Sequence, residues 1–240
     1  MTEYVYGIVE ASAPGPSGTG IGGAPLRLIE GDGAAALVSA VRESEVQLGR
    51  EELLAHARIL SDALERGTVL PMRFGVVMER PDEVRDRLLA EHSAQLREQL
   101  QALAGKVEIE LRATYDESTL MREVVRDHPD IARLAERGDA APYGERIELG
   151  QRVAEAIARA QERDTRDIVE VLSQVAVDVA VRPPGHERVA CSASFLVERE
   201  RLSEFDRVLD AFADGQGGRL RFKYNGPLPP HSFVELAGAA

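Results

Sequence analysis

Apolar and polar residues alternate in four segments of the second half of the chain. In residues 106–112, Val107, Ile109 and Leu111 share one face of an extended segment and charged residues occupy the other. Three further segments show the same period of two: 177–181, 189–197 and 219–224. The pattern therefore predicts four half-buried strands.

Apolar residues recur every three to four residues, the period of a helix, between the first and second of these strands and between the third and fourth. This pattern extends over 117–175, with interruptions at His128-Pro129 and between Gly138 and Gly144, and a shorter amphipathic helix ends near Gly215. The order of strand, helices, strand, strand, helix, strand is that of a split βαβ, or ferredoxin-like, unit with an enlarged first helical region. This topology places the first and last strands side by side and antiparallel.

The predicted neighbours have charged residues of opposite sign on their polar faces. Glu108 and Glu110 belong to the first strand, and Arg219, Arg221 and Lys223 belong to the last. Opposite charges on adjacent strands attract across the ladder. We therefore expect cross-strand ion pairs between these two groups.

The first half of the chain mixes both periods. Residues 3–11 and 26–30 predict strands, and 34–43 is an apolar run that fits either a helix or a strand. One helix is expected from Arg50 to Gly67 and a second from Asp82 to Gly105, on a stripe that includes Val84 and Leu88. Between them, 68–78 predicts a buried strand whose Pro71 indicates an edge position or a bulge.

These elements predict an α+β protein of two domains. The expected boundaries are an N-terminal α+β domain at 1–105, a ferredoxin-like domain at 106–225 and a Pro-rich C-terminal tail at 226–240. A chain of 240 residues is long enough to bury two such cores.

Composition narrows the classes of function. The formal net charge of −12 argues against nucleic acid as a partner, because phosphate neutralisation needs clustered cations. No stretch reaches the roughly 20 apolar residues that span a bilayer, and the N-terminus lacks a basic signal-peptide region, so we expect a cytoplasmic protein without membrane insertion. A single cysteine, Cys191, fits a reducing compartment and excludes an internal disulfide.

Motifs for catalysis or cofactor binding are weak. Gly18, Gly20 and Gly23 have the spacing of a dinucleotide loop, but a strand-like segment follows instead of a helix, so a flexible linker is expected. The five histidines show no metal-binding spacing, and Cys191 lies on the apolar face of its strand as a buried thiol. We expect no enzyme activity, no cofactor and no metal.

Two segments have an unusual composition for plain surface, VLPMRFG at 69–75 and GPLPPHSF at 226–233. Each is interpreted either as a structural part of its own domain, with Phe233 as the anchor of the second, or as a partner-binding element. The candidate residues are Leu70, Pro71, Arg73, Phe74, Gly75, Gly226, Pro227, Pro229, Pro230 and Phe233.

Taken in order, several motifs resemble the GvpF/GvpL family of gas vesicle proteins. They are YVYGIV near the start, AHARIL before VLPMRFG, SFLVER in a strand and GPLPPHSF at the close. The family's closing motif usually has tryptophan and tyrosine where this chain has Leu228 and His231, so a contact made by those rings would be weaker or differently shaped here. The resemblance covers nearly the whole chain.

The resemblance implies an accessory protein of gas vesicle formation. Such a protein is chaperone-like and binds the hydrophobic shell protein and other accessory proteins during nucleation or assembly, and no catalysis is implied. The implied fold has an N-terminal α/β unit, a modified ferredoxin-like C-terminal unit and an extended tail. Two alternatives remain at this point: a small-molecule-binding regulatory module built on ferredoxin-like domains, and an enzyme with a dispersed site.

Overall fold

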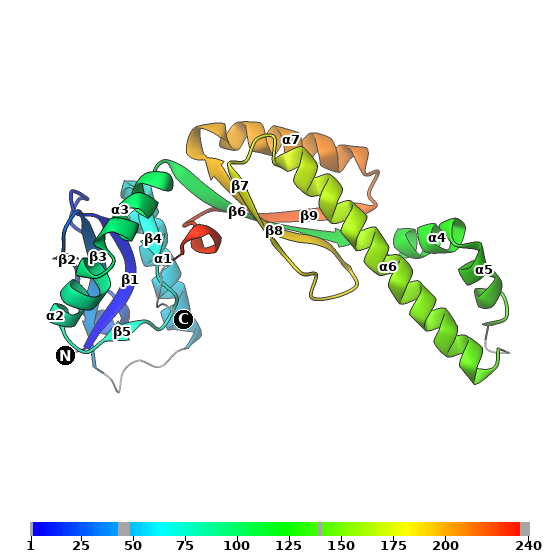
Figure 1. Cartoon of the computed structure of the whole chain (residues 1–240), viewed down its shortest axis with the longest axis horizontal. Helices are drawn as coiled ribbons and strands as arrows, with labels where there is room; N and C mark the ends of the chain where they lie inside the picture. Colours follow the sequence, from blue (N-terminus) through cyan, green and yellow to red (C-terminus); the bar gives the residue numbers. More distant parts are fainter. Residues whose placement is uncertain (1, 43–48, 139–140, 236–240) are drawn as a thin grey trace. The chain divides into compact units, whose positions relative to one another are not determined.

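The computed structural model describes residues 2–42, 49–138 and 141–235. The chain forms two compact units. The described residues of Met1–Glu108 and Pro227–Ala240 make up the first, and Ile109–Gly226 the second. The fold is mixed α and β, with one antiparallel sheet in each unit (Figure 1).

The sheet of the first unit is centred on β1 and β3. Its strands are β1 (Thr2–Glu10), β2 (Leu26–Glu30), β3 (Ala34–Val41), β4 (Val69–Pro71) and β5 (Val77–Met78). The order is β2-β3-β1-β4, with β5 also paired to β1. The ambiguous run is thus a strand over Ala34–Val41, and this strand is apolar at nearly every position because both of its faces are buried. Residue 43 of the run lies outside the described residues.

Helices of the first unit follow the predicted ranges, with one break. Helix α1 (Arg50–Arg66) buries a face that includes His56 and Leu60. The predicted single helix from Asp82 to Gly105 is wrong, because α2 (Pro81–Glu83), a π-helical segment η3 (Val84–Ala90) and α3 (Ser93–Ala102) replace it. The wider π turn shifts the apolar stripe by one residue, so that Leu89 is buried where Leu88 was expected.

The sheet of the second unit has the order β7-β8-β6-β9. Its strands are β6 (Lys106–Tyr115), β7 (Asp178–Arg182), β8 (Val189–Glu198) and β9 (Leu220–Leu228). All four match segments that alternation predicts, and the expectation that the first and last strands are neighbours is confirmed.

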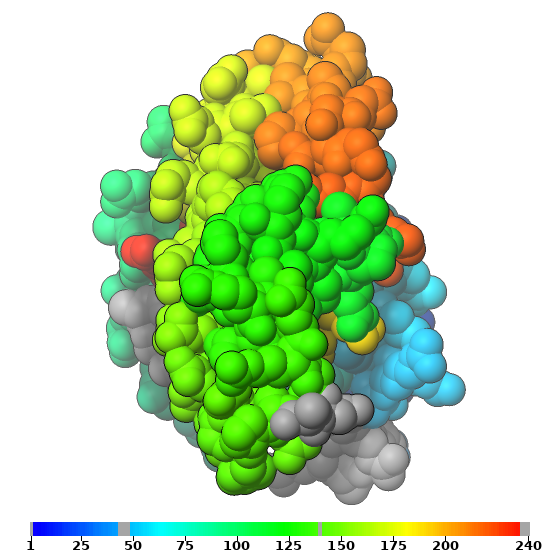
Figure 2. Space-filling model, turned by 90° about the vertical axis from the view of Figure 1, so that its right-hand side faces the viewer, coloured from blue at the N-terminus to red at the C-terminus, as the bar shows by residue number. Residues whose placement is uncertain are grey.

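The second unit contains helices α4 (Glu117–Asp127), α5 (Pro129–Ala135), α6 (Tyr143–Leu172) and α7 (Leu202–Gly215). Helices α6 and α7 pack on one face of this sheet, and α4 and α5 pack against α6 (Figure 1). Figure 2 shows α4 and α5, in green, against the yellow-green α6. The core between sheet and helices contains Phe195 and Phe205, whose ring centroids are 5.5 Å apart.

The predicted ion pairs between β6 and β9 do not form. Asp116 N donates to Arg219 O and Thr114 Oγ1 donates to Arg221 O, so the arginines lie opposite the end of β6, several residues beyond the glutamates. Arg219 and Arg221 pair with carboxylates near them, and Glu110 lies 3.6 Å from Arg182. Glu108 is buried and binds Ser232 instead. The strand neighbours were predicted correctly, but their register was not.

Candidate functional site

Four aromatic rings pack together in the first unit, and the VLPMRFG segment contributes one of them. Tyr4 and Tyr6 come from β1, His56 from α1 and Phe74 from the loop after β4; the His56 centroid lies 5.7, 5.6 and 5.6 Å from the other three in that order. The pairing of β1 with β3 shifts register between Val5 and Gly7, which marks a bulge at Tyr6.

The bulge leads into a close approach between strands at Gly7. A Cβ atom at this position would lie 2.8 Å from the Leu70 carbonyl oxygen and 3.0 Å from side-chain atoms of Leu60 and Val69. Only glycine lets β4 and α1 come this near to β1. The YVYGIV and VLPMRFG motifs are therefore adjacent in space, and each is a packing element of the same sheet.

A directional hydrogen-bond chain links His56 to the VLPMRFG segment. Its Nε2 lies 3.2 Å from Met72 O, which can only accept, so Nε2 has the proton and Nδ1 accepts from the Tyr4 hydroxyl at 3.1 Å. The Tyr4 oxygen in turn accepts from Gly75 N at 2.8 Å. These contacts fix both ends of the turn from Met72 to Gly75, where Gly75 has a φ of 94°.

Burial keeps this cluster neutral. Burial, together with a smaller contribution from nearby His231, lowers the pKa of His56 to about 4, against the opposing effect of the Met72 hydrogen bond. Burial likewise raises the pKa of Tyr4 to about 12. The cluster therefore contains no group that changes charge near neutral pH, which is consistent with a packing role.

The candidate residues of VLPMRFG divide into buried and accessible ones. Leu70 and Pro71 are buried in β4, which lies at the edge of the sheet as the proline predicted. Phe74 and Gly75 are half-buried, and Arg73 is exposed. Among these residues, Arg73 is the one whose side chain is freely accessible to a partner.

The C-terminal tail docks on residues of the first unit. Ser232 N and Oγ donate to the two oxygens of the buried Glu108 carboxylate at 2.8 and 2.7 Å. Further along, Glu235 N donates to Gln99 Oε1 at 3.2 Å and Glu235 O accepts from Gln95 at 2.7 Å. The described part of the tail therefore packs within the chain, on residues that belong to the first unit.

Within the tail, prolines and not the aromatic residue are the most buried. Gly226 and Pro227 are exposed at the end of β9, Pro229 and Pro230 are buried, and Phe233 is half-buried. Because His231 influences the pKa of His56, the tail also lies near the ring cluster. The two sequence motifs, 157 residues apart at Leu70 and Pro227, thus meet in one unit.

The Gly-rich loop is a packed turn and not the free linker that its composition predicts. Ile21 is buried and its N donates to the Tyr6 hydroxyl at 2.7 Å, while that hydroxyl lies 2.8 Å from Ser39 Oγ. Strand β2 follows the loop, so the helix that a dinucleotide site needs does not follow Gly23. An apolar cavity of about 40 Å³ lies beneath the loop beside Leu28 and Ile59.

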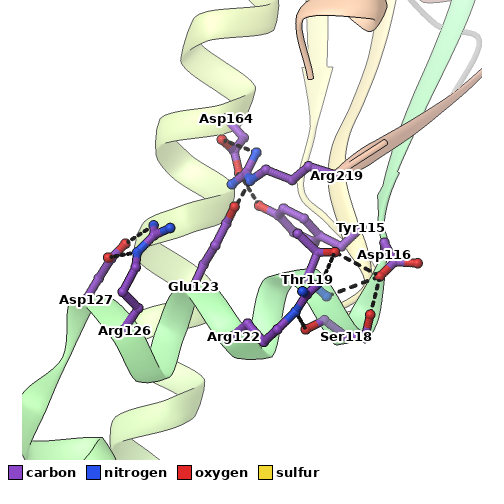
Figure 3. Close-up of polar contacts among 10 residues, drawn as sticks. All are labelled: Tyr115, Asp116, Ser118, Thr119, Arg122, Glu123, Arg126, Asp127, Asp164 and Arg219. Atoms are coloured by element: carbon purple, nitrogen blue, oxygen red, sulfur yellow. Dashed lines mark hydrogen bonds and ion pairs between the residues drawn. The ribbon is translucent and has the colours of Figure 1, made fainter. Parts of the chain in front are cut away.

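A partly buried ionic cluster in the second unit was missed by the sequence interpretation (Figure 3). Arg219, the residue before β9, binds both oxygens of Asp164 on α6, at 3.0 and 2.7 Å, and Glu123 on α4 at 2.7 Å. Tyr115 of β6 donates to Asp164 at 2.6 Å, and the Arg219 guanidinium lies 5.5 Å from the Tyr115 ring centroid. Two strands and two helices are joined at this point.

Electrostatics in the cluster favour the charged pair and the neutral phenol. Burial lowers the pKa of Arg219, but the hydrogen bonds and charges of Asp164 and Glu123 outweigh it, so that its pKa is raised. Burial and then the bond to Asp164 raise the pKa of Tyr115. Every group has a partner, and the cluster holds the fold together instead of offering a reactive atom.

One signal in the sequence marks this cluster. Asp164 occupies a position of the apolar stripe of α6, four residues after Ala160 and four before Ile168. A carboxylate on a buried helix face requires a partner. The sequence alone therefore indicates that Asp164 has a partner, although it does not identify Arg219 as that partner.

The start of α4 beside this cluster is capped by Asp116 (Figure 3). Its Oδ1 accepts from Ser118 Oγ at 2.7 Å and from Thr119 N at 3.1 Å. These bonds, the Ser118 contact first, lower the pKa of Asp116. The polar residues at this end of α4 are therefore explained by helix capping.

Remaining candidates for chemistry are few. Cys191 is buried, and burial raises the pKa of its thiol. Within 2–42, 49–138 and 141–235, no group of three or more His, Cys, Asp or Glu is placed to hold a metal ion. The same ranges contain no helix that is both long and apolar enough to cross a membrane.

The fold identifies the class of protein to which this chain is similar. Crystal structures of the gas vesicle protein GvpF from Anabaena sp. PCC7120 and from Microcystis aeruginosa match it with TM-scores of 0.86 and 0.80. Each match covers 98% of this chain and 99% of the other at 27% identity. The two-sheet architecture is thus that of a gas vesicle accessory protein.

The sequence comparison identifies the family. A model of the family described as gas vesicle synthesis protein GvpL/GvpF matches residues 3–235. Gas vesicle protein F of Streptomyces sp. (strain CB03234) is 38% identical over 98% of this chain and 100% of its own length, and that of Nostoc sp. (strain PCC 7120) is 27% identical over 98% of each. The chain belongs to the GvpL/GvpF family, as the motifs predicted, and has a role in gas vesicle formation.

Proposed function

We propose that this protein is a non-enzymatic assembly factor that binds the gas vesicle shell protein and other accessory proteins during nucleation or assembly of the vesicle. The match of the family model to residues 3–235 is the observation that supports it most. We further propose that the protein acts in the cytoplasm and associates with the vesicle.

A physical argument supports a chaperone-like role. A shell protein that builds a gas-filled wall exposes apolar surface before assembly, and such surface aggregates. A binder with a net charge of −12 keeps the complex dispersed through repulsion between copies. Its own contact surface needs accessible apolar side chains.

Exposed apolar pairs on two helices of the second unit fit this requirement. Met121 and Val125 lie one turn apart on α4 and are 36% and 38% exposed. Tyr143 and Ile147 are spaced in the same way at the start of α6, and Tyr143 is 74% exposed. Pairs at this spacing share one helix face, which suits contact with an apolar partner.

We propose that the second unit is a modified ferredoxin-like domain and that the first is a separate α/β domain. The strand order β9-β6-β8-β7, which is fourth, first, third and second along the chain, supports the ferredoxin-like assignment. We also propose that VLPMRFG and the tail are structural parts of the first unit. Arg73 is the residue among them that is exposed for a partner.

Co-expression with the shell protein of the same vesicle system tests the proposed function. The tagged chain should capture the shell protein, and vesicles should be fewer in cells that lack the chain. A failure to capture the shell protein or any other vesicle accessory protein would refute the proposal.

Matched double variants locate the contact. Tyr143→Ser with Ile147→Ser should weaken capture of the shell protein, because it removes an exposed apolar pair without opening the core. Leu53→Ser with Leu54→Ser is the control, since these α1 residues are also exposed, by 48% and 60%. Equal capture by both double variants would exclude the α6 face as the binding surface.

A further inference from the structure

The sheet of the second unit presents a polar face that none of its helices covers. Along β6, Ile109 and Leu111 point into the core, so the alternating Glu110 and Arg112 point to the opposite side. Figure 1 shows α6 and α7 on the core side of this sheet. The polar face is therefore available within the unit for a partner.

A hollow of about 500 Å³ lies on this face. Its polar lining includes Glu110, Arg112, Arg182, Ser192, Lys223 and Asn225. They come from all four strands, so the hollow is a feature of the folded sheet and not of one loop.

The charge of the hollow opposes that of the whole chain. Arg182 is paired with Glu110 at 3.6 Å and donates to Ser194 at 2.9 Å. Neither Arg112 nor Lys223 has a carboxylate within 4.0 Å among the residues that the structure describes. Two exposed cations without a carboxylate partner among the described residues thus lie on a protein whose net charge is −12.

The register brings these two cations together. Asp116 N donates to Arg219 O, and the Thr114 hydroxyl donates to Arg221 O, so these residues lie opposite each other on the two chains. Two residues further along an uninterrupted antiparallel ladder, Arg112 lies opposite Lys223. Like charges directly opposite each other destabilise a sheet. An anionic group bound between them would convert this repulsion into attraction.

We propose that this face binds an acidic peptide segment of a partner protein, with carboxylates at Arg112 and Lys223. Ser192 and Asn225 supply neutral hydrogen-bonding groups for the backbone of such a segment. A nucleic acid fits less well, because its many phosphates need more cations than this face offers, and the acidic chain repels them. This inference does not rest on the shell-protein proposal, which concerns an apolar partner.

Fluorescence anisotropy with the full-length protein tests the site directly. The probe is a short labelled peptide of alternating glutamate and serine, and a lysine–serine peptide of equal length serves as its counterpart. The protein should bind the glutamate peptide and not the lysine peptide, and affinity should fall as salt is added. Arg112→Gln with Lys223→Gln should weaken binding by about tenfold.

A charge-matched variant separates local from global electrostatics. Arg58→Gln with Arg146→Gln removes the same charge from exposed positions on α1 and α6, and should leave affinity within about twofold. Circular dichroism confirms that both variants fold. The proposal is overturned if the unaltered protein fails to bind, or if both double variants bind equally well. It is also overturned if inorganic phosphate displaces the peptide more strongly than chloride of equal ionic strength, or if a single-stranded oligonucleotide binds more tightly.

Discussion

Acidification should destabilise the first unit through His56. This side chain is 3% exposed, donates from Nε2 to Met72 O and accepts at Nδ1 from Tyr4. A second proton can enter only at Nδ1, where it removes the acceptor that Tyr4 uses. Protonation therefore places a charge in the ring cluster and breaks the chain of bonds that holds Gly75.

The magnitude follows from the difference in pKa between the two states of the chain. The pKa of His56 is about 4 in the fold and 6.5 when unperturbed. Each pKa unit corresponds to roughly 1.4 kcal/mol, so the full effect is about 3 kcal/mol. Between these two pH values the unfolded chain binds more protons than the folded one. The contribution is hence fully present above pH 6.5 and is lost as pH falls toward 4.

Two measurements check this expectation. Histidine ring signals followed by NMR against pH should show one residue that titrates near 4 and that disappears in His56→Gln. Urea titrations followed by the amide signals of β1 give the free energy of unfolding of the first unit. Between pH 7 and pH 4 this free energy should fall by about 3 kcal/mol more in the unaltered chain than in His56→Gln.

A second histidine variant serves as the control for the effect of His56. His186→Gln, at an exposed position of the second unit, should leave the pH dependence of the first unit unchanged. If the His56 signal titrates near 6.5, or if His56→Gln has the same pH dependence as the unaltered chain, the argument from burial is wrong.

Three further expectations concern stability and accessibility. Asp164→Ala should lower the free energy of unfolding of the second unit by about 3–5 kcal/mol, because it leaves Arg219 partly buried beside Tyr115 without its bidentate partner; Glu155→Ala, at an exposed pair, should cost less than about 1 kcal/mol in the same urea titration. Phe233→Ala should destabilise the first unit by only about 1–2 kcal/mol, since the ring is half-buried, and a larger loss in the β8 amide signals than in those of β1 would contradict the docking described above. Cys191 should react with a thiol reagent only after unfolding, because burial both shields it and raises its pKa, and rapid labelling of the native protein would disprove this.

Periodicity predicted many of the elements well, because a strand or helix with one buried face leaves a regular pattern of apolar residues. The four strands of the second sheet and the neighbouring positions of β6 and β9 follow from alternation and from the order of elements alone. The register of β6 with β9 does not follow, because either register keeps the apolar residues on the core side. A shift by two residues gives every residue a new cross-strand neighbour but leaves each side chain on the same face of the sheet.

The candidate site was harder to predict, since its contacts join residues far apart in sequence. The VLPMRFG and tail motifs were recognised as unusual, but nothing in either shows that both belong to the first unit. Nor does the sequence around His56 indicate that Tyr4 and Met72 lie beside it. A histidine on the apolar face of a helix can have many different neighbours, and only the folded structure shows which ones it contacts.

The two surfaces proposed for the second unit differ in chemistry and in position. The apolar pairs at Met121 and Tyr143 belong to α4 and α6. Helix α6 packs on the core side of the sheet and α4 packs against α6, whereas Arg112 and Lys223 lie on the opposite face of the sheet. A partner at one surface therefore leaves the other accessible. Added salt weakens an attraction between exposed charges but leaves apolar contact intact or stronger. Salt should thus release an acidic segment while the shell protein stays bound, which lets the two interactions be separated in a single preparation.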